Sequence, residues 1–261
     1  MTVRIARVFA SLALTLGLGG CTNFYEISIE TPIQPKMDVS PFQRVLIAGF
    51  VTGGSEDVDA NLETVRLLRS QLRSQSRLQV IDAEVLSLVE IAVEQAQAVN
   101  DERPDAAPVQ QELPSPEAIS SEEDLEPYER IFANVSFWRT LGEEFQEPLI
   151  VTGTVLFTPH SRAGFVTQER EVYDTFGRRQ VRPVRTYRDR KGFVLSPKFI
   201  FIDGRTGTTL YSESHREEIL YEASQNTPAL SSYFELMDRL LPTFLSALST
   251  QTIRGTRVLL K

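Results

Sequence analysis

The sequence predicts an α/β fold with a mixed β-sheet flanked by helices and a disordered acidic insert. An apolar run of strand length at residues 44–50 indicates a strand buried on both faces. Residues 59–76 carry apolar side chains at helical spacing, with acids in the first turn and arginines later, as the helix dipole favours. A second strand at residues 78–82 and a second helix at residues 83–99 complete a strand-helix-strand-helix order.

The second half of the chain continues with both types of element. A helical stretch at residues 128–142 precedes a β-rich strand at residues 148–157, in which Gly153 indicates a bulge or close packing. Two further strands are predicted at residues 193–202 and 208–221. Residues 203–207 between them are predicted to form a hairpin turn.

A long amphipathic helix is predicted near the end of the sequence. Thr227 is expected as its N-cap and Pro228 as its first residue, and Pro242 should kink it. Residues 256–261 fit one more short strand.

Residues 1–20 have the pattern of a lipoprotein signal peptide. A basic start precedes an apolar run at residues 8–18, which is too short to span a bilayer. The run closes with Leu18-Gly19-Gly20-Cys21, which resembles the lipobox of bacterial lipoproteins. Cys21 is the only cysteine, so we expect it to carry diacylglyceryl and acyl groups as the mature N-terminus, the alternative being an ordinary thiol.

The predicted location is the periplasmic face of the outer membrane, with the protein held to the membrane through its lipid anchor. Thr22 follows the cysteine, whereas retention in the inner membrane resembles a rule that requires Asp at this position. Residues 21–42 contain three prolines and are predicted to form a tether, although alternating apolar residues from Phe24 also fit a short edge strand. Residues 43–261 are expected to form a single α/β domain.

The net charge of −8 is concentrated in one segment. Residues 100–127 hold nine acidic residues against Arg103, together with five prolines and few large apolar side chains. Such a segment cannot bury enough surface to offset the entropy of ordering, so a disordered insert is predicted there. It is either a solvated connection or an acidic decoy for a basic stretch further along the chain.

That basic stretch, residues 160–191, contains nine basic and four acidic residues interleaved with aromatic side chains. Because arginine binds phosphates and carboxylates and stacks on aromatic rings, we expect a surface for an acidic envelope protein or an anionic envelope surface. The alternative is a solvated hairpin, and nucleic acid is not expected as a partner. The predicted partner-binding residues are Arg178, Arg179, Arg182, Arg185 and Arg188.

No residue pattern specifies an enzymatic chemistry. The two histidines, His160 and His215, stand in no nucleophile motif, and zinc would need more close Cys, His or acidic ligands than the sequence offers. Gly53-Gly54-Ser55 matches no phosphate-binding motif and is expected to be a turn. We therefore expect no enzyme, metal or cofactor, and an enzyme acting on envelope polymers is the alternative.

Several strands resemble a known envelope module. The elements that carry the likeness are the strand at residues 45–50, the helix ending at residues 69–72, the strand at residues 78–82, the helical stretch at residues 128–142, the strand at residues 150–155 and the hairpin at residues 203–207. In this order they are similar to the amino-terminal domain of TolB and the periplasmic domain of CsgG. The resemblance implies an assembly or interaction domain without catalytic residues. A pore like that of CsgG needs an apolar lipid-facing alternation, whereas residues 160–191 have arginines at both parities. These arginines argue against such a pore. A secretion-channel subunit and a homo-oligomer are further alternatives.

Replacing Cys21 with alanine should abolish lipidation, because no other thiol can accept diacylglycerol. The measurement is incorporation of labelled palmitate in a bacterial host, with Thr22→Ala as the control that keeps the label. Labelled palmitate on the Cys21→Ala protein would rule the lipobox assignment out.

Overall fold

The computed structural model describes residues 24–101, 119–173, 175–225 and 227–260. They fall into two units, a two-stranded ribbon within residues 24–35 and 250–260 and an α/β domain spanning Lys36–Ser249. The predicted signal peptide and Cys21 lie outside the described residues. No helix in the described ranges is both long enough and apolar enough to cross a membrane.

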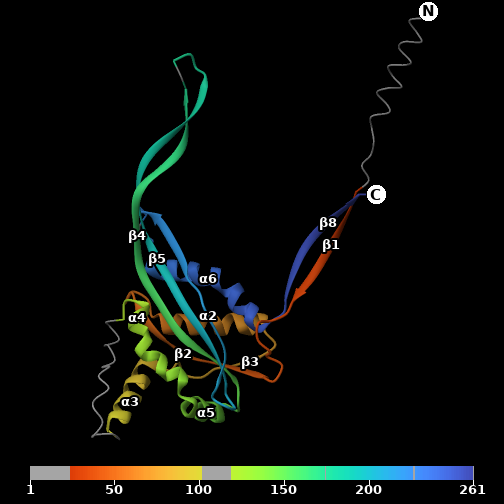
Figure 1. The fold of residues 1–261 in the computed structure, drawn as a ribbon, viewed down its shortest axis with the longest axis vertical. Coiled ribbons are helices and arrows are strands. Elements are labelled where there is room, and N and C mark those ends of the chain that lie inside the picture. Colours follow the sequence, from red (N-terminus) through yellow and green to blue (C-terminus); the bar gives the residue numbers. More distant parts are fainter. Residues whose placement is uncertain (1–23, 102–118, 174, 226, 261) are drawn as a thin grey trace, which may run out of the picture. The chain divides into compact units, whose positions relative to one another are not determined.

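The α/β domain is built on a six-stranded mixed sheet with the strand order β3-β2-β4-β5-β6, in which β7 also pairs with β5. The three strands β3, β2 and β4 are parallel, and β5 runs antiparallel to β4, β6 and β7. Figure 1 shows these strands side by side, with β4 and β5 continuing beyond the others. The strands are β2 (Arg44–Gly54), β3 (Gln79–Ile81), β4 (Leu149–Tyr173), β5 (Arg179–Asp203), β6 (Thr209–Ser214) and β7 (Glu217–Glu222).

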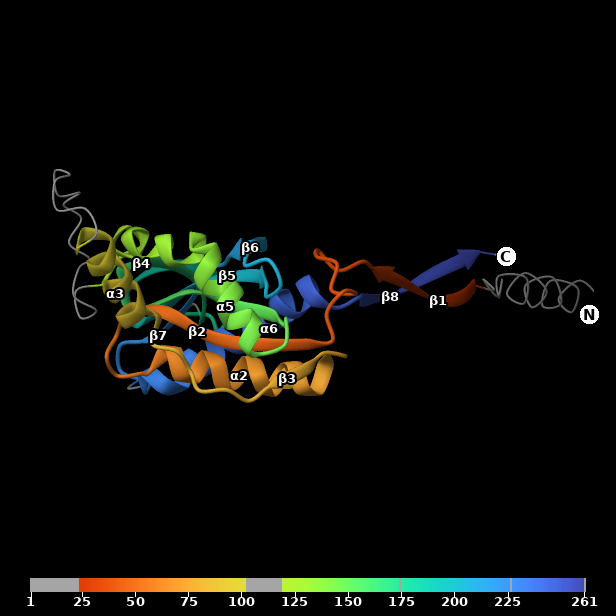
Figure 2. The same ribbon diagram turned by 90° about the horizontal axis from the view of Figure 1, so that it is seen from below.

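Helices cover both faces of this sheet and bury two hydrophobic clusters. The first cluster lies against α2 (Ala60–Gln75) and α6 (Ala229–Leu248). The second lies on the opposite face (Figure 2). Its helices are α3 (Leu88–Asp101), α4 (Glu122–Leu125), the 3-10 helix η2 (Glu126–Ala133) and α5 (Val135–Glu144). The predicted α/β class, a mixed sheet flanked by helices, is confirmed.

A bulge in β2 sets which side chains face which cluster. Val45 and Ile47 face the first cluster, but after the register shift between Ile47 and Gly49 it is Phe50 that faces it. Gly49 has φ +146°, and the amide of Leu86 donates to the carbonyl of Ala48 over 2.8 Å. This contact holds the chain extended after β3, so α3 begins five residues later than predicted.

The predicted helix at residues 59–76 agrees closely with α2, because Asp59 caps it by accepting from the amide of Leu62 over 2.9 Å. Close packing at Gly153 is also confirmed: it has φ +143°, and a methyl group there would overlap the carbonyl oxygen of Lys198. The predicted helical stretch at residues 128–142 is divided at Asn134, whose side chain caps α5.

The predicted strand at residues 208–221 is instead two strands, β6 and β7. They are separated by His215 and Arg216 and pair with successive parts of the same edge of β5. Pro228 is the N-cap of α6 rather than its first residue, and the helix runs through Pro242.

The predicted disordered insert is wrong for residues 119–127. Ile119 is 1% exposed and packs in the second cluster with Leu125. Its carbonyl accepts from the amide of Gly54 over 2.8 Å, and Ser121 forms a capping box with Asp124. Two apolar side chains and a cap are therefore enough to order this part, and residues 102–118 lie outside the described residues.

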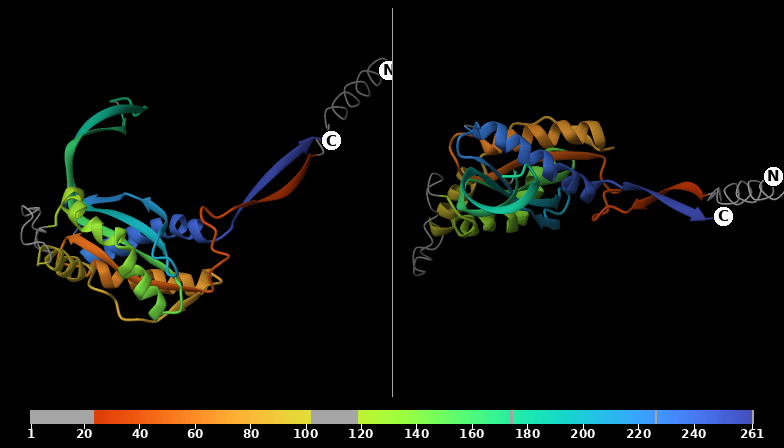
Figure 3. Two further views of the ribbon diagram at one scale, coloured as in Figure 1. Left: turned by 60° about the horizontal axis from the view of Figure 1, so that its bottom comes forward. Right: turned by 90° about the horizontal axis from the view of Figure 1, so that it is seen from above.

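The two-stranded ribbon pairs β1 (Phe24–Ile33) antiparallel with β8 (Gln251–Leu260) (Figure 3). The edge strand that the sequence allows near Phe24 and the short strand that it allows near the end of the chain are thus both present and pair with each other. The segment expected to be a tether therefore contains a strand. One face of the ribbon carries exposed isoleucines, namely Ile27, Ile29, Ile33 and Ile253.

Replacing Ile119 with alanine should lower the free energy of unfolding by about 2–5 kcal/mol, because it removes buried methyl groups and leaves a cavity beside β2. Urea denaturation measures the change. The exposed Leu230→Ala variant is the control and should stay within about 0.5 kcal/mol of the unsubstituted protein. An Ile119→Ala protein as stable as that control would show that residues 119–127 do not pack on the domain.

Candidate functional site

The most distinctive surface of the domain is the hairpin formed by β4 and β5. Each strand has 25 residues, and the Cα pairs run without a break from Leu149↔Asp203 to Tyr173↔Arg179. The first part of the hairpin lies in the sheet core, and its distal part continues beyond the other strands (Figure 1). Most side chains of residues 160–191 are exposed. The hairpin therefore presents a long surface that the core does not require.

The register of this hairpin separates its charges by face. In an antiparallel pair, directly opposite residues share a face and successive residues alternate between faces. The even-numbered positions of residues 158–173 and 179–194 share one face, which we call the arginine face. It contains no carboxylate of the hairpin and carries Arg162, Arg170, Arg182, Arg188 and Arg190.

The odd-numbered positions form the opposite face, which we call the mixed face. It carries three basic and three acidic residues, and Arg179 forms an ion pair with Glu171. Arg185 lies over the ring of Phe165 at 5.3 Å, and that ring packs edge-on against Tyr187 at 5.3 Å. Since the charges of the mixed face balance, the positive excess of residues 160–191 lies on the arginine face.

The structure does not bring the five predicted partner-binding residues onto one surface. Arg182 and Arg188 lie on the arginine face, whereas Arg179 and Arg185 lie on the mixed face. Arg178 belongs to the turn and stands over the ring of Phe176 at 5.4 Å. Arg162, Arg170 and Arg190 also lie on the arginine face, although they are not among the predicted partner-binding residues. The turn signal at residues 174–177 indicates this register, because pairing the two strands about it places these arginines on one face.

Only part of the positive charge on the arginine face is neutralised. Arg188 donates to Glu222 of β7 over 2.9 Å, and Arg182 donates to the amide oxygen of Gln180 over 2.9 Å. Within the described ranges, no carboxylate forms an ion pair with Arg162, Arg170 or Arg190. The like charges of the directly opposite pairs Arg162↔Arg190 and Arg170↔Arg182 repel each other.

The distal end of the hairpin also exposes apolar surface. Phe176 in the turn is 81% exposed and Tyr173 beside it is 67% exposed. Val172 is an exposed apolar residue of the arginine face. Aromatic and cationic groups therefore meet at the end of the hairpin, where none of the described strands pairs with it.

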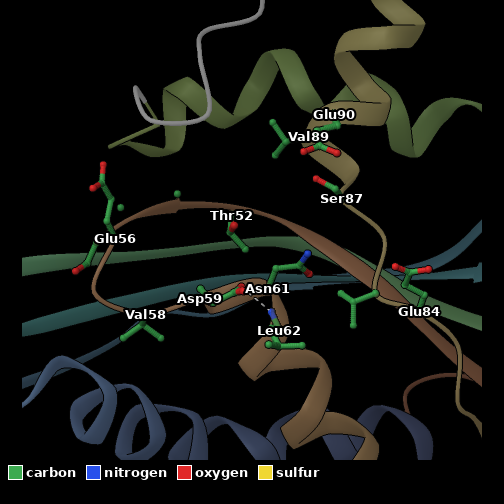
Figure 4. A pocket seen from close by; sticks show the side chains of 15 residues that line it. Thr52, Glu56, Val58, Asp59, Asn61, Leu62, Glu84, Ser87, Val89 and Glu90 are labelled. Atoms are coloured by element: carbon green, nitrogen blue, oxygen red, sulfur yellow. Dashed lines mark hydrogen bonds between the residues drawn. The ribbon is translucent and has the colours of Figure 1, made fainter.

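A pocket of about 740 Å³ opens where β2 leads into α2. Its lining includes Glu56, Asp59, Glu84 and Glu90, but Asp59 is already engaged as the cap of α2. Figure 4 shows the other three at separate borders of the pocket, not pointing toward one another. Gly54, at the predicted turn, has φ +100° and belongs to this lining. The pocket thus brings together no pair of carboxylates for acid-base chemistry.

The two histidines lie apart from this pocket. The Nε2 atom of His160, at the base of the hairpin, lies 3.7 Å from Glu218, and that of His215 lies 3.8 Å from Glu213. Burial lowers the pKa of His215, and Lys36 lowers it further against the opposing effect of Glu213. Within the part of the chain that the structure describes, no group of His, Cys, Asp or Glu side chains could hold a metal ion.

Comparisons with known proteins assign no family to the chain. No protein-family model matches the chain, and no curated protein matches it. Among solved structures, it is similar to Lipoprotein GNA1162 from Neisseria meningitidis, with 12% identity and a TM-score of 0.34 over 77% of this chain and 97% of that one. A likeness at this score carries no argument, and the resemblance to TolB and CsgG gains no support from these comparisons.

The domain should lose stability as the pH falls below about 6.5, because the unfolded chain then takes up a proton that the buried imidazole of His215 resists. His215→Gln should flatten the fall in the free energy of unfolding between about pH 7 and pH 5, whereas the exposed Leu230→Ala control should leave it in place. Urea denaturation across this range measures both. An unchanged slope in His215→Gln would show that this imidazole does not control the dependence.

Proposed function

We propose that the protein is a lipid-anchored protein of the bacterial envelope, held through Cys21 to the periplasmic face of the outer membrane. Its α/β domain serves as a non-enzymatic assembly or interaction module. The observation that carries this proposal is the β4–β5 hairpin, whose residues 160–191 extend a charged, exposed surface that packing of the domain does not need. The lipobox-like sequence before Cys21 supports the anchor.

The hairpin has the physical properties of a docking element. Its base is fixed, because β5 pairs with β7 through residues 190–195 and its inner part is buried in the sheet. Beyond that support, its polar and aromatic side chains face outward, and charged groups outside the core act chiefly by attracting partners of opposite charge. Neither property requires a catalytic centre.

An enzyme that acts on envelope polymers is the second candidate, because the pocket at β2 and α2 has four carboxylates in its lining. Their separate positions and the capping role of Asp59 favour the interaction module. Loss of an envelope polymer-cleaving activity in Glu84→Gln or Glu90→Gln protein would favour the enzyme.

Photo-crosslinking in cells tests the docking role. A photoreactive amino acid in place of Phe176 or Val172 should give crosslinked products with an envelope component, since both side chains are exposed on the hairpin. The same amino acid in place of Arg77, which is exposed just after α2, is the control and should give none. Products from position 77 alone, or from none of the three positions, would contradict a docking hairpin.

A further inference from the structure

We propose that the arginine face of the β4–β5 hairpin binds the phosphate groups of an anionic phospholipid bilayer. The arginine face lies along the headgroups, Phe176 enters the interface at the hairpin end, and the mixed face is turned to water. This inference rests on the proposed docking role of the hairpin and names the surface on which it docks.

The separation of charge is the first argument. The five arginines of this face share it with no carboxylate of the hairpin, while the mixed face carries three basic and three acidic residues. Directly opposed arginines repel one another in water, and phosphate groups between them would remove that repulsion. Arginine is suited to this role because its planar guanidinium group can donate two hydrogen bonds to one phosphate.

The spacing of the arginines indicates an extended ligand. The pairs Arg162↔Arg190 and Arg170↔Arg182 are eight residues apart along β4, which corresponds to about 26 Å at about 3.3 Å per residue. One phosphate or another small anion cannot bridge the two pairs. A bilayer presents phosphate groups along the whole arginine face, and these groups need no fixed spacing to reach the arginines.

The apolar residues favour a bilayer over an acidic protein. Val166, Val172 and Val184 lie on the arginine face between or beside its arginine pairs. A protein surface with enough carboxylates to match the arginines would place charge against these valines. At a bilayer interface, cationic groups meet phosphates while valine and Phe176 reach the acyl boundary.

The expected contribution of these arginines is large enough to measure. Each basic side chain near an anionic membrane surface contributes about 1 kcal/mol, so three of them should change the partition coefficient by about 100-fold. Arg162, Arg170 and Arg182 are the informative set, because all three are exposed and none forms an ion pair with a carboxylate of the described residues.

The test measures sedimentation of the mature chain, residues 21–261 with Cys21→Ser, together with lipid vesicles. No acyl group then contributes to binding. The chain should bind vesicles of phosphatidylglycerol mixed with phosphatidylcholine, and phosphatidylcholine alone should bind it weakly. Binding should fall as salt rises, because the screening length shortens from about 10 Å at 0.1 M to about 3 Å at 1 M.

Two triple variants with the same change in net charge separate the faces. R162Q/R170Q/R182Q should lower binding to the anionic vesicles by about 100-fold. R179Q/R185Q/K191Q, which alters the mixed face, should lower it far less. Circular dichroism and thermal unfolding confirm that both variants are folded. Equal losses in the two variants would show that overall charge alone drives binding and would overturn the role of the arginine face.

The remaining outcomes distinguish this inference from the docking role. If the unsubstituted chain binds anionic vesicles no better than phosphatidylcholine, while position 176 crosslinks to an envelope protein, the hairpin docks on protein and the bilayer inference is wrong. If neither vesicle binding nor crosslinking occurs, both proposals fail. Inorganic phosphate that replaces sodium chloride at constant ionic strength should not displace the chain from vesicles. Displacement would contradict the bilayer inference and indicate a site for a free anion instead.

Discussion

The continuous pairing of β4 with β5 is the constraint on which the rest of the structure depends. The same ladder that places Leu149, Val151 and Phe201 in the core continues to the turn without a register shift. Because side chains alternate at every step, the register chosen in the buried part decides which residues share a face at the exposed end. The core therefore sets the composition of the arginine face some distance away from it.

The strength of that constraint comes from packing at the inner part of the hairpin. Gly153 lets the backbone of β4 approach the carbonyl of Lys198, and Phe157 stacks on Phe193 with ring centres 4.7 Å apart. A slip by one residue would turn every buried side chain of the strand toward the wrong cluster. This cost greatly exceeds any gain from pairing arginines with acids, so the arginines stay where the core places them.

The sequence predicted the individual helices and strands better than the contacts between them. The strand at residues 44–50, the helix that becomes α2 and the role of Gly153 follow from local patterns that tertiary packing does not override. The order of residues 119–127 depends on Ile119 filling space beside β2, and the start of α3 depends on the contact between Leu86 and Ala48. Both are contacts between distant parts of the chain, which composition cannot show. The arginine face depends on the same kind of relation, because its arginines come together across the two strands of the hairpin and not along the chain.

The two faces of the distal hairpin contribute differently to its stability. A two-stranded ribbon has little stability of its own in water, and β7 supports β5 only through residues 190–195. Beyond that point the strands depend on cross-strand contacts, which the mixed face provides through the Phe165 and Tyr187 rings and the Glu171–Arg179 ion pair. These contacts offset repulsion on the arginine face. The hairpin can thus keep a cationic surface that is only partly neutralised, because its other face holds the two strands together.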